Sequence, residues 1–306
     1  MPGFQNHAGI NLTNAKMQLV EVNYSDEEFL IENADEEFFS EFLDLNAKET
    51  KVLSTLQSAF DELVMRRPLK SKLVSFTLPN SLFHVVRLPF ENTLVQTDML
   101  EEFKWELSAL FPKSSREEML VQSIKVDDNK KTSSSAIVVA TYKKYLKLLN
   151  SFCLKNGLKL KFVDNAHMAS DRIISMSQSF GDREVVLSVY AGGESLSVAF
   201  LFKGKPIYFN ISTVSNAGEI LPRISEELEA GKALKINPAS ISRAFIAGDN
   251  ISDSLLERAA KTLNIDFSRF NPFEEIKVNP ELFESRALTE RANSFSPAAG
   301  IAFRLV

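Results

Sequence analysis

The sequence predicts an α/β protein with mixed β-sheets, built from two related halves. A strand hairpin opens each half: GINLTNAKMQLVEV near the start, and VLSVYAGGESLSVAFLF just after the middle. Each hairpin is followed by a helical pattern and then by another strand pattern. A unit repeated at half the chain length indicates duplication. Hairpins continued by strand–helix–strand crossovers predict mixed sheets with helices on the outside.

The first half begins with two strands and a long helix. AGINL and KMQLVEV lie on either side of a tight turn at Thr13 and Asn14 and have the alternation of strands. Apolar residues recur on one face between Ala47 and Arg67, which predicts an amphipathic helix ended by Pro68. Two strands follow, KLVSFTLP and FHVVRLPF, and each is stopped by a proline.

The next segment adds two helices around a hairpin. A helix capped by Thr97 or Asp98 runs to Pro112, and its Trp105 is expected to be part of the core. MLVQSIKV and SSAIVVATY predict two strands joined by the polar loop 127–135. A basic amphipathic helix spans 143–156 and ends at Gly157, a residue type that tolerates a left-handed C-cap.

The second half continues with a strand, LKLKFVDN, and a helix over 166–180. EVVLSVYAG, ESLSVAFLFKG and KPIYFNIS predict a three-stranded meander with Gly204 at its second turn. A helix over 217–230, the strand SRAFIAG and a helix over 253–263 follow, and the chain ends in a short helical segment within FSPAAGIAFRLV.

Composition excludes several classes of function. The chain has 306 residues, a net charge of −5 and a sequence pI near 5.5, so nothing in it indicates a nucleic-acid surface. No apolar run reaches the roughly 18 to 20 residues of a membrane span, and no secretory signal is recognised. The single Cys153 fits a reducing compartment, so we expect a cytoplasmic protein. His7, His84 and His167 lack the spacing of a zinc site, and no metal ligand or catalytic residue is assigned.

Several segments carry a family resemblance that extends over nearly the whole chain. They are GINLTNAKMQLVEV, VSFTLPNSLFHVVRLPF, LEEFKWELSALFP, AFIAGDNISDSLLERAAKTLNI, and FNPF followed by AAGIAFRLV. In order and spacing they resemble the PilM family of type IV pilus assembly proteins, within the actin-like superfamily that also includes FtsA and GspL. The resemblance implies two ribonuclease-H-like lobes with mixed sheets, an inserted α+β subdomain, and a nucleotide held between the lobes.

The resemblance also implies a division of the chain. The first actin-like lobe would comprise 1–78, completed by the helix over 166–180. Residues 79–164 would form the inserted subdomain, which in that family helps self-association and partner contact. The second lobe would comprise 165–306.

The positions that match the nucleotide site depart from the family's pattern. ATP with Mg²⁺ is the implied ligand, but an asparagine replaces the first magnesium-organising aspartate, Ser188-Val189-Tyr190 stands for the second Asp-x-Gly, and Asp249 replaces a glycine. Neutral side chains cannot balance a divalent cation. The sequence therefore argues against efficient ATP hydrolysis. If nucleotide binding is retained, the matched positions are Asn11, Thr13, Lys16, Ser188, Gly192, Gly193, Ser195 and Gly248.

Three alternatives remain open at this point. Each hairpin is also explained as a plain structural turn, because Asn and Thr satisfy backbone groups locally. An active ATP-hydrolysing enzyme of the same fold would need a positioned carboxylate, for which Asp164 and Glu194 are the nearby candidates. The chain is also compatible with the cytoplasmic domain of a GspL-like secretion protein.

The resemblance further implies a partner. In PilM-like systems a groove of the inserted subdomain holds the N-terminal tail of PilN, an inner-membrane protein. We expect such a groove at Phe83, Val85, Arg87 and Phe90, with the alternative that these residues only pack beneath the helix that carries Trp105. The protein would then lie at the inner membrane through its partner, without inserting into the membrane itself.

Overall fold

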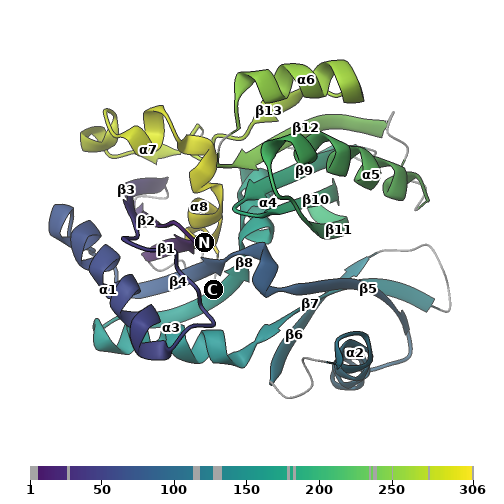
Figure 1. Ribbon diagram of the computed structural model, residues 1–306, viewed down its shortest axis with the longest axis horizontal. Coiled ribbons are helices and arrows are strands. Elements are labelled where there is room, and N and C mark those ends of the chain that lie inside the picture. The colour runs from purple at the N-terminus through teal and green to yellow at the C-terminus, as the bar shows by residue number, and fades with distance from the viewer. Residues whose placement is uncertain are drawn as a thin grey trace.

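Three β-sheets flanked by helices make up the computed structural model (Figure 1). The structure describes residues 6–25, 28–112, 118–126, 133–177, 180–181, 184–233, 236, 240–249, 251–274 and 276–304. Most of the expected polar loop over 127–135 lies outside these residues. The mixed sheets with external helices confirm the predicted fold class.

The first sheet has six strands in the order β14-β3-β2-β1-β4-β8. Helices α1 (Glu49–Arg66) and α3 (Lys143–Lys155) pack on the face that carries Ala8, Ile10 and Leu12 of β1. Helix α8 (Ser296–Ala302) packs on the opposite face, where Gly9 leaves no room for a side chain: a Cβ there would lie 2.1 Å from the carbonyl oxygen of Ala298. The strands are β1 (His7–Leu12), β2 (Lys16–Ser25), β3 (Glu28–Phe38), β4 (Leu73–Leu78), β8 (Lys159–Asn165) and β14 (Lys277–Val278).

The second sheet has five strands in the order β11-β10-β9-β12-β13 and includes the predicted meander. Helices α5 (Ile220–Ala233) and α6 (Asp253–Leu263) cover one face. Helix α4 (Ala166–Ser177) lies against the other face, where its Ile173 and Ile174 join the core between the lobes. The strands are β9 (Val185–Gly192), β10 (Ser195–Phe202), β11 (Lys205–Thr213), β12 (Ile241–Gly248) and β13 (Phe267–Arg269).

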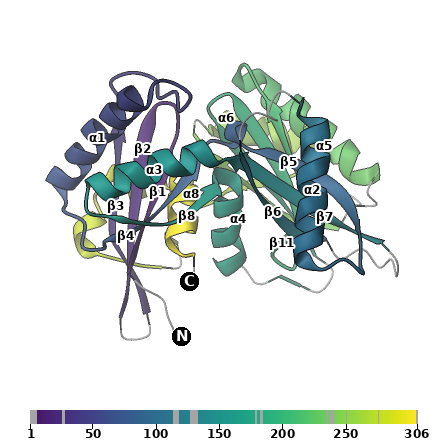
Figure 2. The ribbon, with the colours of Figure 1, turned by 90° about the horizontal axis from the view of Figure 1, so that it is seen from below.

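The third sheet forms the inserted unit, in the order β5-β7-β6. Its strands are β5 (His84–Glu91), β6 (Met119–Val126) and β7 (Ser133–Tyr142), and α2 (Gln96–Leu110) packs on one face through Phe103 and Leu107 (Figure 2). The other face turns toward β11 of the second sheet. The expectation for Trp105 is wrong: its side chain is 67% exposed, because Phe103 and Leu107 occupy the buried side of α2.

The chain returns to its first sheet at the C-terminus. Strand β14 pairs in parallel with β3, and α8 contacts β1, β2 and β4. Strand β8 pairs with β4 of the first sheet, and helix α3 packs against that sheet. Both lie within the expected insertion of 79–164. We therefore propose that the insertion comprises 79–142, and that 143–165 and 277–304 complete the first lobe. Short helical turns connect the elements: Asn80–Leu82, Ala217–Glu219, Pro280–Leu282, Arg286–Thr289 (α7) and Ala292–Phe295.

Among the described residues, no helix combines the length and the apolar character that a membrane crossing needs.

A buried histidine holds the C-terminal helix against the first sheet. Nδ1 of His7 lies 2.9 Å from the carbonyl oxygen of Ala302, and Nε2 lies 2.7 Å from Oγ of Ser75. The carbonyl can only accept, so Nδ1 carries the proton and Nε2 accepts from the serine. Burial lowers the pKa of His7 to about 4. Its neutral form therefore joins β1, β4 and α8.

We predict that His7 makes the protein less stable in acid. Its contribution is complete above pH 6.5 and decreases as the pH falls toward 4, because the unfolded chain then binds a proton that the folded chain excludes. Relative to pH 7.5, wild type at pH 4.5 should lose about 2 to 3 kcal/mol more unfolding free energy than His7→Gln. Urea unfolding measures this difference. Burial also lowers the pKa of the half-buried His84, so His84→Gln is the comparison variant and should reduce the acid dependence by less than His7→Gln does. Equal losses in wild type and His7→Gln would contradict the prediction.

Candidate functional site

Two hairpin tips meet between the lobes. In the first, Oγ1 of Thr13 accepts hydrogen bonds from the backbone N–H groups of Ala15, at 3.1 Å, and Lys16, at 3.0 Å. In the second, Gly193 adopts φ +60°, and Oγ of Ser195 donates to the carbonyl of Gly192 at 2.9 Å. A Cβ on Gly193 would lie 3.7 Å from Oδ1 of Asn14, so the tips are in contact range. The structure thus brings the two predicted phosphate hairpins together.

Lys16 joins the two lobes through an ion pair. Its Nζ lies 2.9 Å from Oε2 of Glu36, on β3, and 2.8 Å from Oδ1 of Asp249, just after β12. The lysine side chain is only 5% exposed. Glu36 also pairs with Arg291 and accepts from Nε2 of Gln18 at 3.1 Å. Burial raises the pKa of Glu36, but the hydrogen bonds and charges of Lys16 and Arg291 lower this pKa overall. Lys16 is therefore paired with one carboxylate from each lobe.

The sequence resemblance matches Asn11 to an aspartate that is expected to organise magnesium. Its side chain is fully buried: Nδ2 donates to Oε1 of Gln18 at 2.9 Å, and Oδ1 accepts from Oγ1 of Thr77 at 2.8 Å. Tyr190 also hydrogen-bonds to Asn11 and stacks on His167, with 6.0 Å between the ring centroids. Burial, followed by the charge of Asp249, raises the pKa of Tyr190. A neutral phenol and amide thus fill the space behind the hairpins.

Ser188 lies below the cleft, fully buried on β9. Its Oγ donates to Oδ1 of Asp171 at 2.5 Å and lies 3.0 Å from Nε2 of His167. Both partners belong to α4 and are four residues apart in the sequence, which places them on one helix face. The sequence analysis missed this cluster, although the His167–Asp171 spacing was the available signal. Ser188 is therefore not brought together with the cleft residues.

Gly248 is required by backbone packing alone. It adopts φ +119°, and a Cβ would lie 1.9 Å from the carbonyl oxygen of Ala191. Its own carbonyl accepts from Nδ2 of Asn293 at 2.9 Å. Backbone packing thus explains why glycine stands at this position, without a nucleotide.

Two cavities flank the Lys16–Asp249 ion pair. One, of about 410 Å³, lies beside Thr13, Phe42 and Gly193, and the other, of about 390 Å³, lies beside Phe38 and Arg291. Both are bordered by Ala15 and Asp249, so the ion pair lies at their boundary. The charges of Lys16 and Arg291 balance those of Glu36 and Asp249. In the part of the chain that the structure describes, no group of three or more His, Cys, Asp or Glu residues could hold a metal ion.

The two carboxylates considered for catalysis lie apart. Oδ2 of Asp164 accepts from Arg172 at 3.0 Å and from Arg304 at 3.1 Å, beside a separate cavity. Glu194 lies at the tip of the second hairpin and borders the cleft. Only Glu194 is brought to the cleft.

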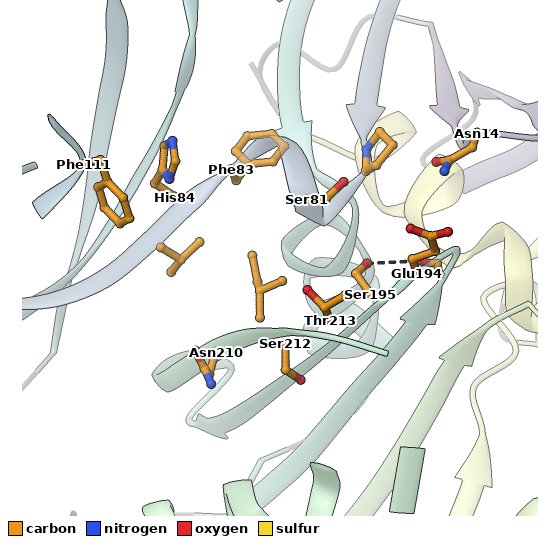
Figure 3. Close-up of a pocket in the computed structure, with 14 residues that line it drawn as sticks. Asn14, Ser81, Phe83, His84, Phe111, Glu194, Ser195, Asn210, Ser212 and Thr213 are labelled. Atoms are coloured by element: carbon orange, nitrogen blue, oxygen red, sulfur yellow. Dashed lines mark hydrogen bonds between the residues drawn. The ribbon is translucent and has the colours of Figure 1, made fainter. Parts of the chain in front are cut away.

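A further cavity, of about 440 Å³, lies between the inserted sheet and β11 (Figure 3). Phe83 and Val85 line it from the inserted side, beside His84, whose ring lies on that of Phe111 with 4.2 Å between centroids. The opposite wall, which the sequence analysis missed, comes from β11 and the second hairpin: Ser195, Asn210, Ile211, Ser212 and Thr213.

The other two predicted groove residues do not line this cavity. Nε of Arg87 donates to Oγ of Ser135 at 2.9 Å, across the β5–β7 pair. Phe90 is buried against Phe103 under α2, on the opposite face of the sheet from Val85. The structure therefore brings together Phe83 and Val85 but separates Phe90 from them.

Comparison with known proteins identifies the fold. No family model and no curated protein sequence matches the chain. A chain of the solved PilM–PilN type IV pilus biogenesis complex is similar with a TM-score of 0.82, at 17% identity over 97% of this chain and 98% of that chain. A Bacteroides thetaiotaomicron protein with an actin-like ATPase fold and unknown function has a TM-score of 0.55, at 14% identity over 98% of this chain and 96% of that one.

A third solved structure is similar, the ethanolamine utilization protein EutJ from Carboxydothermus hydrogenoformans. Its TM-score is 0.50, at 11% identity over 99% of this chain and 90% of that one. At such identities the likeness establishes the fold alone. The chain has the actin-like fold.

We predict that removing the Lys16 ammonium destabilises the protein. Lys16→Met leaves Glu36 and Asp249 without their shared partner and should cost about 3 kcal/mol of unfolding free energy. Urea unfolding at pH 7.5 measures this. Lys51→Met is the matched control, because the pair of Lys51 with Glu41 is about half exposed and should contribute less than about 1 kcal/mol. A Lys16→Met loss no larger than that of the control would contradict the assignment.

Proposed function

We propose that this protein is a non-catalytic, actin-like scaffold of a type IV pilus or related secretion machine. It works in the cytoplasm, at the inner membrane, and binds the N-terminal tail of a PilN-like inner-membrane protein. The observation that carries the proposal is the Lys16 ion pair with Glu36 and Asp249, which uses up within the chain the charge that a phosphate would need.

The cleft chemistry supports a degenerate nucleotide site. A phosphate would have to displace a carboxylate from Lys16, and the cluster around that lysine offers no net positive charge. Magnesium bound to a nucleotide prefers carboxylate oxygens and retained waters. Asn11 is neutral, and both its amide atoms are engaged by Gln18 and Thr77. The position matched to the magnesium-organising aspartate therefore offers no carboxylate, and Lys16 offers no free charge, which argues against phosphoanhydride cleavage.

The groove beside β11 supports peptide binding. Its lining combines apolar side chains, Phe83, Val85 and Ile211, with hydroxyl and amide groups from β11. Strand β5 ends one sheet and β11 ends another, so each has an edge on which an extended peptide can add backbone hydrogen bonds. The similarity to a chain of the PilM–PilN complex supports a PilN-like tail as the peptide.

The inserted unit is also the proposed surface for self-association. Helix α2 carries Trp105, 67% exposed, and Leu110, 52% exposed, on its outer side. Large apolar side chains on an outer helix face favour contact with another protein. The net charge of −5 does not favour nucleic acid as that partner.

We predict that the groove binds the N-terminal tail peptide of a PilN-like protein. Fluorescence anisotropy with a labelled synthetic peptide should give saturable binding, and Phe83→Ala should weaken it at least about tenfold by removing an aromatic anchor. Phe283→Ala, at a 60% exposed site outside the groove, is the control and should bind like wild type. Equal affinity of wild type and Phe83→Ala, or no binding by either, would refute the groove assignment.

We predict that Mg-ATP does not bind at physiological levels. Isothermal titration should detect no binding tighter than about 1 mM, because Lys16 stays paired with Glu36 and Asp249. A phosphate-release assay accompanies it. Micromolar binding with turnover that Lys16→Ala abolishes would establish the active enzyme instead.

A further inference from the structure

The outer side of helix α2 combines acidic groups with a large aromatic side chain. Met99, Phe103 and Leu107 bury one side of the helix against the inserted sheet. Because an α-helix has 3.6 residues per turn, the opposite side is centred near Glu101 and Trp105, which are both exposed. The helix sequence, QTDMLEEFKWELSAL, contains four carboxylates and one ammonium group. This face is therefore acidic around its tryptophan.

The outer side of helix α3 has the opposite charge. Its sequence, KKYLKLLNSFCLK, contains four lysines and no acidic residue. The residues that it buries against the first sheet are Tyr145, Leu148, Leu149, Phe152 and Cys153. Lys147 and Leu154 lie on the other side, and Leu154 is 69% exposed. One acidic side chain, that of Glu118, pairs with Lys143 at 2.6 Å, so the helix surface keeps a net positive charge.

Both helices lie on one face of the molecule. In Figure 2 both are in front of the sheets, α3 over the first lobe and α2 over the inserted unit, and in Figure 1 both lie along the lower side. Their ends approach each other at His84. The ring of His84 contacts that of Phe111, just after α2, and that of Tyr142, just before α3, with 4.2 and 5.7 Å between centroids. One face thus has a basic half beside an acidic half.

A second copy of this chain matches both halves of the face at once. Rotation by 180° about an axis that runs in the face between the helices places α3 of each copy on α2 of the other, so the same contact forms twice. Opposite charges meet in both contacts. The ammonium of Lys147 can also lie on the ring of Trp105, an aromatic group of the kind enriched at interfaces. An anionic membrane or nucleic acid attracted by α3 would be repelled by α2.

We propose that the protein forms a closed two-fold dimer, in which the basic face of α3 docks on the acidic face of α2 of the other copy. The dimer presupposes the proposed self-association of the inserted unit and specifies the surface that the unit contacts. Because both halves of the face are used between two copies, assembly stops at the dimer. The described residues that line the peptide groove belong to other segments of the chain, so the dimer leaves the groove open.

The fluorescence of Trp105 reports directly on this face, since the chain contains a single tryptophan. Sedimentation velocity from about 1 to 100 μM should show a monomer–dimer equilibrium, and the tryptophan emission should shift to shorter wavelength as the dimer forms. Raising the salt concentration from about 0.05 to 0.5 M should weaken the dimer several-fold. A monomer throughout, or assembly beyond the dimer, overturns the proposal. An emission shift that needs phosphatidylglycerol vesicles rather than protein concentration assigns the face to a membrane and also overturns it.

Charge reversal tests the contact between the two helices. Lys147→Glu or Glu101→Lys alone places like charges in both contacts, so each should weaken the dimer at least about tenfold. An equimolar mixture of the two variants should restore near wild-type dimerisation, because the heterodimer has one reversed contact and one wild-type contact. Lys261→Glu and Glu257→Lys, exposed on α6, are the matched controls and should dimerise like wild type. Wild-type dimerisation by Lys147→Glu, or no recovery in the mixture, overturns the proposal.

Two comparisons separate the dimer from the proposed function. Trp105→Ala removes the aromatic group of the inserted unit, so wild-type dimerisation by this variant contradicts the proposed self-association surface itself. A dimer lost in Trp105→Ala but kept in Lys147→Glu leaves that surface standing and overturns only the docking on α3. Lys147→Glu should bind the tail peptide like wild type, because the groove is lined by other segments. Failure of the wild-type protein to bind the peptide therefore counts against the groove and not against the dimer.

Discussion

A lysine buried between two sheets needs negative partners, and this requirement organises the centre of the molecule. An unpaired ammonium in a dry interior costs several kcal/mol, so the place of Lys16 depends on both Glu36 and Asp249. Glu36 comes from the same sheet as the lysine, whereas Asp249 follows the last residue of β12 in the other sheet. One ion pair therefore sets the approach of the two lobes and, at the same time, removes the free charge from the cleft. The two hairpin tips therefore meet beside a lysine whose charge is already balanced by carboxylates.

The proposed loss of nucleotide chemistry does not require loss of the fold, because two of its tightest contacts are contacts of backbone with backbone. Gly9 admits the carbonyl of Ala298, and Gly248 admits that of Ala191, and neither contact involves a ligand. Tyr190 fills the volume behind the hairpins and is held by Asn11 and His167. A large aromatic group with a satisfied hydroxyl is a stable filler for a buried space. The actin-like frame is thus supported by packing that the sequence itself supplies.

The sequence predicted elements with strong periodicity and missed features that depend on distant partners. The two hairpins, α1 and the meander were recoverable because alternation and helical spacing are local signals. Strand β3 was missed because its acidic residues are unusual for a strand; Glu36 and Asp35 are there to meet Lys16 and Arg66, which only the fold brings near. The C-terminal return of β14 and α8 to the first sheet has no local signal. Trp105 was misplaced because Phe103 and Leu107 fit the same helical pattern and are the residues that face the sheet.

Strand β11 connects the surfaces on which the proposed function depends. Its C-terminal residues Asn210 to Thr213 line the groove beside Phe83 and Val85, and its central Phe209 lies on His167, with 5.0 Å between the ring centroids. His167 in turn stacks on Tyr190, directly behind the paired hairpins. A peptide added along β11 would therefore contact a strand that packs into the core between the lobes. The groove and the packing behind the hairpins are therefore connected by direct contacts through this strand.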